Sequence, residues 1–245
     1  MSRSNLATID CFILAGGLGT RLASTVPDLP KVLAPIDGVP FLAVLLGWLK
    51  SFGARRVVIG LGHRADQVLS YLETSPIDGL DIVPIIEPAP LGTAGALRFA
   101  AEYFSTDPVL MLNGDSFVDA DLDAFVTDHA ASGDEVSLLC THVDNTERFG
   151  TVVVGPDGAI EAFREKDEGC HGGGIINAGV YLLSRSFLNR LTEYEQGSLE
   201  RDVFARMPRK SLHAFVSPGV FIDIGTPEDY ARAPSILGPY LPIQS

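Results

Sequence analysis

Short apolar runs alternate with longer amphipathic segments over the first half of the chain. The runs are rich in Val, Ile, Leu and Phe, as buried β-strands are. The segments between them repeat apolar residues at helical spacing. The predicted strands are residues 9–15, 56–61, 80–86, 109–112 and 136–141, and the predicted helices are residues 41–52, 65–72, 93–104 and 122–131. Such alternation is typical of a doubly wound, largely parallel sheet.

The pattern changes after about residue 148. Residues 151–154 and 160–163 flank the turn sequence Gly155-Pro-Asp-Gly158, which predicts an antiparallel hairpin. The remaining predicted elements are strands at residues 175–183, 212–215 and 220–224, a helix near residues 198–205 and a final helix that begins at Pro227. We therefore expect the α/β class: one domain, residues 1–245, with a single Rossmann-like doubly wound mixed sheet and a small antiparallel element.

Composition excludes several classes of protein. The 245 residues are 46% hydrophobic, enough for a sizeable core, and the net charge of −13 disfavours a nucleic-acid partner. Cys11, Cys140 and Cys170 form no CxxC pair, which fits a reducing cytoplasm. No signal-peptide-like stretch occurs, and the longest apolar run, residues 41–49, is too short to span a bilayer. We expect a cytoplasmic protein without a membrane partner; the sequence does not predict its oligomeric state.

A glycine-rich loop, Leu14-Ala-Gly-Gly-Leu-Gly-Thr-Arg-Leu22, follows the first predicted strand. Its glycines let the backbone turn tightly and bring N–H groups close to an anion, and Arg21 and Lys31 add positive charge. The P-loop pattern GxxxxGK[ST] is absent, and the dinucleotide pattern GxGxxG fails because Gly17-Leu-Gly19-Thr-Arg-Leu22 ends in leucine. The forked donors of Arg21 suit a triphosphate, so we interpret the loop as a nucleoside triphosphate site.

Two aspartates stand at the ends of predicted strands. Asp115 follows the strand at residues 109–112 in the sequence Asn113-Gly114-Asp115, and Asp223 lies among apolar neighbours before Gly225. Either aspartate alone is typical of a turn. Ligands of open α/β sheets bind at the carboxyl ends of the strands, where two carboxylates could share one Mg²⁺.

The loop, followed by Pro30-Lys31, resembles the signature of the sugar-1-phosphate nucleotidyltransferases, and the resemblance runs over nearly the whole chain. It implies a Mg²⁺-dependent enzyme in which Arg21 binds the triphosphate and Lys31 lies near the reacting phosphates. It also implies that Asp115 and Asp223 are the metal ligands. Two departures concern the shape of the loop: Val32 replaces a common second Pro, and Ala23-Ser24 stands where many members have a Pro.

The resemblance extends to the base and sugar segments. Glu87-Pro-Ala-Pro-Leu-Gly-Thr93 resembles the segment that meets the base edge, through Glu87 and the backbone near Gly92. A carboxylate can accept from both N1–H and N2–H₂ of guanine, whereas uracil and thymine offer one donor, so we favour GTP over UTP or dTTP. Glu165-Lys166 resembles the pair that contacts the sugar and its phosphate, and Phe149-Gly150-Thr151 and Asn177-Ala-Gly179 resemble sugar segments.

The implied site can be stated in full. The nucleotide-binding residues are Leu14, Ala15, Gly16, Gly17, Gly19, Thr20, Arg21, Lys31, Glu87, Gly92 and Thr93; the sugar-phosphate-binding residues are Asn113, Gly150, Glu165, Lys166 and Asn177; the metal ligands are Asp115 and Asp223; and the catalytic residues are Arg21, Lys31, Asp115 and Lys166. The nucleotide part covers about residues 1–115 and the sugar part about residues 116–245.

The expected reaction transfers GMP from GTP to a sugar 1-phosphate and releases pyrophosphate. The chain length and the segments around Phe149 and Asp223 resemble the D-glycero-α-D-manno-heptose 1-phosphate guanylyltransferases, which supply bacterial surface polysaccharides. Three alternatives remain open: a mannose-1-phosphate guanylyltransferase, a short uridylyltransferase for an amino sugar, and a regulator that binds a sugar nucleotide without catalysis.

Overall fold

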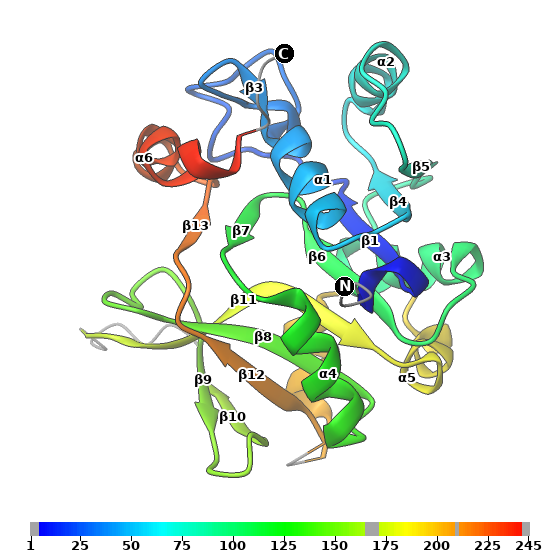
Figure 1. The fold of residues 1–245 in the computed structure, drawn as a ribbon, viewed down its shortest axis with the longest axis vertical. Helices are drawn as coiled ribbons and strands as arrows, with labels where there is room; N and C mark the ends of the chain where they lie inside the picture. Colours follow the sequence, from blue (N-terminus) through cyan, green and yellow to red (C-terminus); the bar gives the residue numbers. More distant parts are fainter. Residues whose placement is uncertain (1–4, 165–171, 209–210, 242–245) are drawn as a thin grey trace.

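The computed structural model describes residues 5–164, 172–208 and 211–241. Four parallel strands form one half of its main sheet, in the order β5 (Asp81–Ile86), β4 (Arg56–Leu61), β1 (Asp10–Ala15) and β6 (Val109–Asn113). The chain passes from β1 to β4 and β5 on one side and then to β6 on the other (Figure 1). The strand order therefore reverses at β1, as a doubly wound sheet requires.

An antiparallel strand joins this half to the rest of the sheet. β11 (Gly174–Leu183) runs antiparallel to β6 and also to β8 (Val136–Val143), and β12 (His213–Ser217) lies parallel to β8 beyond it. The predicted hairpin is formed by β9 (Thr151–Val154) and β10 (Ile160–Arg164), and β9 pairs with β11 at one position. The expected mixed sheet with an antiparallel element is confirmed.

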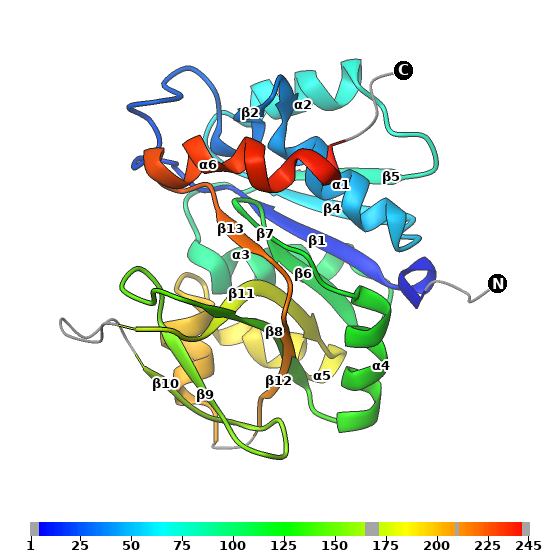
Figure 2. The same cartoon turned by 60° about the vertical axis from the view of Figure 1, so that its left-hand side comes forward.

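Helices cover both faces of the sheet because adjacent strand residues point to opposite sides. In β1, Cys11 and Ile13 belong to one buried cluster, whereas Phe12 belongs to the other. The first cluster packs beneath α1 (Phe41–Ser51), α2 (Ala65–Thr74), α4 (Leu122–Ser132) and α6 (Pro227–Leu237), and the second packs beneath α3 (Gly92–Ala100) and α5 (Arg185–Arg190) (Figure 2).

Several short elements were not predicted. β7 (Ser116–Val118) was not predicted, and it pairs antiparallel with β13 (Phe221–Asp223), which lies within the predicted strand at residues 220–224. β2 (Pro35–Ile36) and β3 (Val39–Pro40), which pair with each other, were also not predicted. The helix predicted near residues 198–205 is instead a π-helix, Leu199–Val203, followed by a 3₁₀ turn, Phe204–Arg206. The other 3₁₀ turns are Asn5–Thr8, Lys31–Leu33, Ala101–Tyr103, Leu191–Glu193 and Gly238–Tyr240. Among the described residues, the helices lack the length and apolar character needed to cross a membrane.

Candidate active site

The loops after β1 and β6 meet at the carboxyl edge of the sheet. Gly114, just after β6, donates its N–H to the carbonyl of Leu14 at 2.8 Å. A Cβ at Gly114 would come within 2.7 Å of that same carbonyl oxygen, so a larger residue cannot stand there without moving a strand. Because β1 is the strand at which the order reverses, this edge is where an open α/β sheet places its ligand.

The glycine-rich loop folds back against the segment that follows β5. A Cβ at Gly16 would lie 2.6 Å from Glu87 Oε1, so glycine is needed for this close approach. Gly19 adopts a left-handed backbone with φ of +60°, and its carbonyl accepts the N–H groups of Leu22 and Ala23. Gly17, Thr20 and Arg21 are exposed, and Arg21 lines the cavity described below. The structure thus places this predicted anion-binding loop beside Glu87.

Asp115 and Asp223 are brought together by the β7–β13 pair. In this pair Asp223 lies opposite Ser116, and the Ile224 N–H donates to the Asp115 carbonyl at 2.9 Å. Lys31 lies between the two carboxylates, with its Nζ 2.7 Å from Asp115 Oδ2 and 3.7 Å from Asp223 Oδ1. Three residues predicted from distant parts of the chain therefore converge.

Burial raises the pKa of Asp223, and the nearby charge of Asp115 raises it further, whereas Lys31 lowers it. The pair thus favours a cation that can neutralise both groups. In the described part of the chain, no group of three or more His, Cys, Asp or Glu residues is arranged to hold a metal. Mg²⁺, however, is commonly held by one or two carboxylates plus substrate phosphates. The side chain of Asp115 is 41% exposed, and both aspartates line the cavity, so they fit that kind of site.

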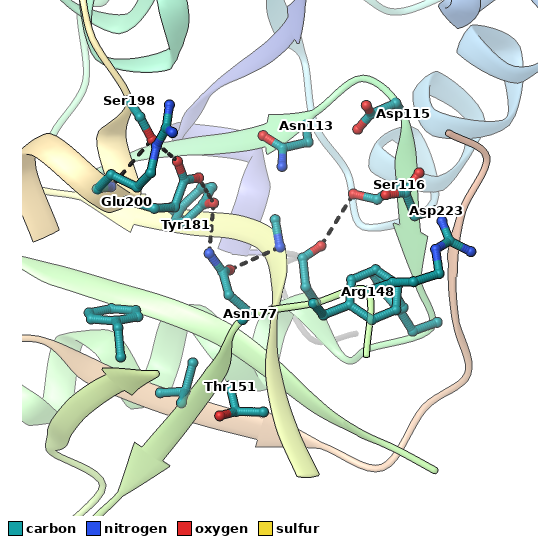
Figure 3. A pocket seen from close by; sticks show the side chains of 18 of the residues that line it. Asn113, Asp115, Ser116, Arg148, Thr151, Asn177, Tyr181, Ser198, Glu200 and Asp223 are labelled. Atoms are coloured by element: carbon teal, nitrogen blue, oxygen red, sulfur yellow. Dashed lines mark hydrogen bonds between the residues drawn. The ribbon is translucent and has the colours of Figure 1, made fainter. Parts of the chain in front are cut away.

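A cavity of about 600 Å³ extends from the aspartates toward β9, β11 and the π-helix (Figure 3). Arg21, Asp115 and Asp223 lie at its charged end. Val152 and Phe163 contribute apolar surface elsewhere, and Asn177 lies between on β11. The volume and the mixture of apolar walls with a few polar groups are those of a small-molecule site.

A bulge in β11 shapes the floor of this cavity. The pairing with β8 shifts between Asn177 and Val180, and Gly179 within it has φ of +77°. A Cβ at Gly179 would lie 2.6 Å from Asn113 Nδ2 and 3.0 Å from Ser116 Oγ. Asn113 Oδ1 is buried and accepts no hydrogen bond from a described residue. A buried acceptor without a partner is costly, so this oxygen is a candidate to accept from a ligand.

Replacing Gly179 by Ala is expected to destabilise the fold by about 2 kcal/mol, because alanine is strained at positive φ and its Cβ would strike Asn113. Chemical denaturation measures this directly. Gly47→Ala is the matched control: Gly47 is in α1, a Cβ there meets nothing within 4 Å, and alanine favours a helix. Equal stabilities of the two variants would contradict the account of the bulge.

Glu87 lies beside the glycine-rich loop, and neither it nor the residues that follow it up to Thr93 line this cavity. Glu87 is half-buried, and its Oε2 accepts from the Leu91 N–H at 3.3 Å. Burial raises the pKa of this carboxyl, and the Leu91 N–H lowers it in part. Gly92 has φ of +69° and packs against Gly197, and the Thr93 hydroxyl accepts from the Leu199 N–H at 2.6 Å. Gly92 and Thr93 therefore also hold the π-helix segment, while their nucleotide-binding role stays a prediction.

Some predicted and unpredicted residues remain to be placed. Leu14 and Ala15 end β1, and Gly150 lies on the exposed rim before β9. Glu165 and Lys166 lie outside the described residues. Sequence reasoning did not select six further polar residues that line the cavity: Ser116, Arg148, Tyr181, Ser198, Glu200 and Arg201. Ser198, Glu200 and Arg201 lie in the π-helix Leu199–Val203 or at its N-cap, and a π-helix is often found at a functional site. The sequence of this segment predicts only an ordinary helix.

Comparisons with known proteins point in one direction. A family model described as nucleotidyl transferase matches residues 11–237. A D-glycero-alpha-D-manno-heptose 1-phosphate guanylyltransferase from Aneurinibacillus thermoaerophilus is 34% identical over 234 residues, covering 95% of this chain and 100% of that protein. A mannose-1-phosphate guanylyltransferase from Mycobacterium tuberculosis is 30% identical and covers 91% of this chain but 63% of that protein. HddC from Yersinia pseudotuberculosis, in a crystal structure complexed with GMP-PN, superposes with a TM-score of 0.81 at 34% identity, covering 93% of this chain and 98% of that one.

Proposed function

Because the chain belongs to the nucleotidyl transferase family, we propose that it transfers GMP from GTP to a sugar 1-phosphate, with D-glycero-α-D-manno-heptose 1-phosphate as the preferred acceptor. One observation carries the proposal. Asp115, Asp223 and Lys31 converge beside Arg21 at one end of a cavity of about 600 Å³. A nucleotidyl transfer needs this combination of a charged end for phosphates and room for a sugar. The substrates are water-soluble metabolites, and we propose that the enzyme acts in the cytoplasm.

The reaction is an in-line displacement. An oxygen of the sugar 1-phosphate attacks the α-phosphorus of GTP, the bond from that phosphorus to the bridging oxygen breaks, and pyrophosphate leaves with the electron pair. No protein nucleophile takes part. Two anions must approach each other, so positioning and charge neutralisation provide most of the rate acceleration. Arg21 neutralises the leaving pyrophosphate through its forked donors. The sequence resemblance gives Lys166 the same task at the attacking phosphate.

Asp115 and Asp223 would hold Mg²⁺. When bound, this ion supplies positive charge at the phosphate oxygens, which the acidic protein lacks overall. Lys31 keeps the two carboxylates close together through its contacts with both. Burial of Asp223 limits competing hydration of its carboxylate.

The relatives favour guanine and leave two candidate sugars. The proteins similar to this chain include guanylyltransferases for heptose 1-phosphate and for mannose 1-phosphate, and the HddC structure contains GMP-PN. Heptose is preferred here because the segments around Phe149 and Asp223 resemble those of the heptose 1-phosphate guanylyltransferases. The heptose relative is also 34% identical over 95% of this chain, against 30% over 91% for the mannose relative from Mycobacterium tuberculosis. Glu87 lies beside the glycine-rich loop, and we propose that its carboxylate accepts from both donors of the guanine edge.

Pyrophosphate release across a matrix of triphosphates and sugar 1-phosphates tests the proposal. We expect release with GTP and D-glycero-α-D-manno-heptose 1-phosphate, weaker release with mannose 1-phosphate and very little with UTP. Release only with UTP would contradict the guanine assignment. No release with any pair would favour a regulator that binds sugar nucleotides.

The pH dependence of GTP use provides a second test. Glu87 can accept from both guanine donors only when it is ionised, and burial raises its pKa above the usual glutamate value. As pH falls through that raised pKa, Glu87 becomes protonated and the KM for GTP should rise. This rise should begin at a higher pH than an exposed glutamate would give. The ratio of wild-type to Glu87→Gln KM values, measured at each pH, removes the contribution of phosphate ionisation. A ratio independent of pH would contradict this role.

A further inference from the structure

A chain of hydrogen bonds leads from the floor of the sugar cavity to the π-helix. Asn177 Nδ2 donates to the Tyr181 hydroxyl at 2.9 Å, and that hydroxyl donates to Glu200 Oε1 at 2.8 Å (Figure 3). At the other end of the carboxylate, Ser198 Oγ donates to Glu200 Oε2 at 2.9 Å and Thr93 Oγ1 donates to it at 3.4 Å. Glu200 is therefore the common acceptor at which these bonds end.

The direction of the chain follows from the number of protons available. Tyr181 is fully buried, and burial together with Glu200 raises its pKa well above the usual value, so its hydroxyl keeps a single proton. That proton goes to the carboxylate, which can only accept. The hydroxyl oxygen is left as an acceptor and must meet a donor, so Asn177 presents its NH₂ group there. The amide oxygen of Asn177 then accepts from the Gly179 N–H at 3.0 Å.

Both ends of the Asn177 amide are thus fixed by the protein. Among the bonds to residues that the structure describes, one N–H of the NH₂ group and one lone pair of the amide oxygen remain for a ligand. Asn177 lines the same cavity as Asp115 and Asp223. Two neighbouring hydroxyls of a ligand would meet a donor at the NH₂ group and an acceptor at the amide oxygen, in positions that the protein fixes. Such a fixed arrangement can distinguish sugar epimers, which differ in the direction of one hydroxyl.

We propose that Glu200 is a positioning residue for the sugar: acting through Tyr181, it fixes which way the Asn177 amide faces and so sets affinity for the sugar 1-phosphate and preference among sugars. This inference rests on the proposed function. The π-helix holds Glu200 in position. Ser198 caps the same turn by accepting from the Arg201 N–H. Thr93 joins the arrangement to the segment after Glu87.

Two substitutions separate this role from simple support of the fold. Glu200→Gln replaces one acceptor oxygen by an NH₂ donor, so the three hydroxyls that point at it can no longer all donate to it. Tyr181→Phe removes the link to Asn177 altogether. We expect the KM for the sugar 1-phosphate to rise about tenfold in each variant, which is the loss of affinity expected when one hydrogen bond to the sugar is removed. The KM for GTP and the affinity for GTP without sugar should change less than threefold.

A double-mutant cycle strengthens the test. Because Glu200 acts through Tyr181, the KM for sugar in Tyr181→Phe/Glu200→Gln should equal that of Tyr181→Phe, whereas independent effects would multiply. The preference for heptose over mannose 1-phosphate should fall in all three variants. Glu193→Gln, an exposed change in the turn before the π-helix, removes the same charge and is the control.

Different results would overturn the positioning role of Glu200 and the proposed function. An unchanged KM for sugar in Glu200→Gln, or a loss of activity shared equally between both substrates and matched by loss of folded protein, would overturn the positioning role. GTP affinity and thermal unfolding measure the folded fraction, and if Tyr181→Phe fails to fold then Glu200→Gln carries the test alone. Absence of turnover in the wild-type enzyme with every sugar would instead overturn the proposed function.

Discussion

Replacing Asp115 by Asn should reduce kcat/KM by about 10³-fold, equivalent to roughly 4 kcal/mol of transition-state stabilisation. Asparagine keeps the shape of the side chain but removes the negative charge with which we propose that Asp115 holds Mg²⁺. It also removes the charge that pairs with Lys31 at 2.7 Å, and leaves a lysine that is only 13% exposed to compete for Asp223. Pyrophosphate release at saturating Mg²⁺ is the measurement.

A remote control isolates the effect of position from that of net charge. Asp78 is exposed in the turn before β5, at the edge of the sheet opposite the site, so Asp78→Asn should retain normal turnover. Asp223→Asn should resemble Asp115→Asn. Normal turnover in Asp115→Asn at saturating Mg²⁺ would show that this carboxylate is not a metal ligand in the reaction.

Replacing Glu87 by Gln should change the base that the enzyme prefers. Glutamine presents one acceptor and one NH₂ group, so it loses a hydrogen bond with guanine and places a donor against a donor. It complements an edge with one donor and one carbonyl, as in uracil. We expect kcat/KM for GTP to fall by about 100-fold, equivalent to roughly 3 kcal/mol, and the ratio of UTP to GTP use to rise.

Kinetics with the two triphosphates at a fixed sugar 1-phosphate concentration measure this change. Glu102→Gln, an exposed substitution beyond α3, is the matched control and should leave both values unaltered. A parallel loss for GTP and UTP would mean that Glu87 supports the loop without contacting the base.

Much of the fold was predictable because its periodic segments are long. The strands at residues 56–61 and 151–154 have the predicted bounds, and the alternation of strands and helices correctly implied the doubly wound half. A buried strand of a parallel sheet is a continuous apolar run, so it can be predicted from the sequence without knowing which distant strands pair with it. The loop after β1 and the aspartate after β6 followed from the same logic, since both stand at strand ends.

The missed elements depend on contacts between distant parts of the chain. Three residues, Ser116–Val118, are too few to show a period, and they form a strand because Phe221–Asp223 lies beside them. The bulge at Gly179 similarly needs Asn113 and Ser116 as neighbours. Tyr181 and Glu200 are ordinary members of a strand and a helix in the sequence, and only the fold shows that they are hydrogen-bonded.

The pairing of β7 with β13 also determines when the proposed catalytic centre is completed during synthesis of the chain. Chains grow from the amino terminus, and the triphosphate loop, Lys31 and Asp115 emerge long before Asp223. A ribosome-bound chain that ends before β13 lacks the second carboxylate and the strand that orders the first. Nascent chains that end before β13 therefore hold an incomplete centre, and the two proposed metal ligands come together only after Asp223 has emerged.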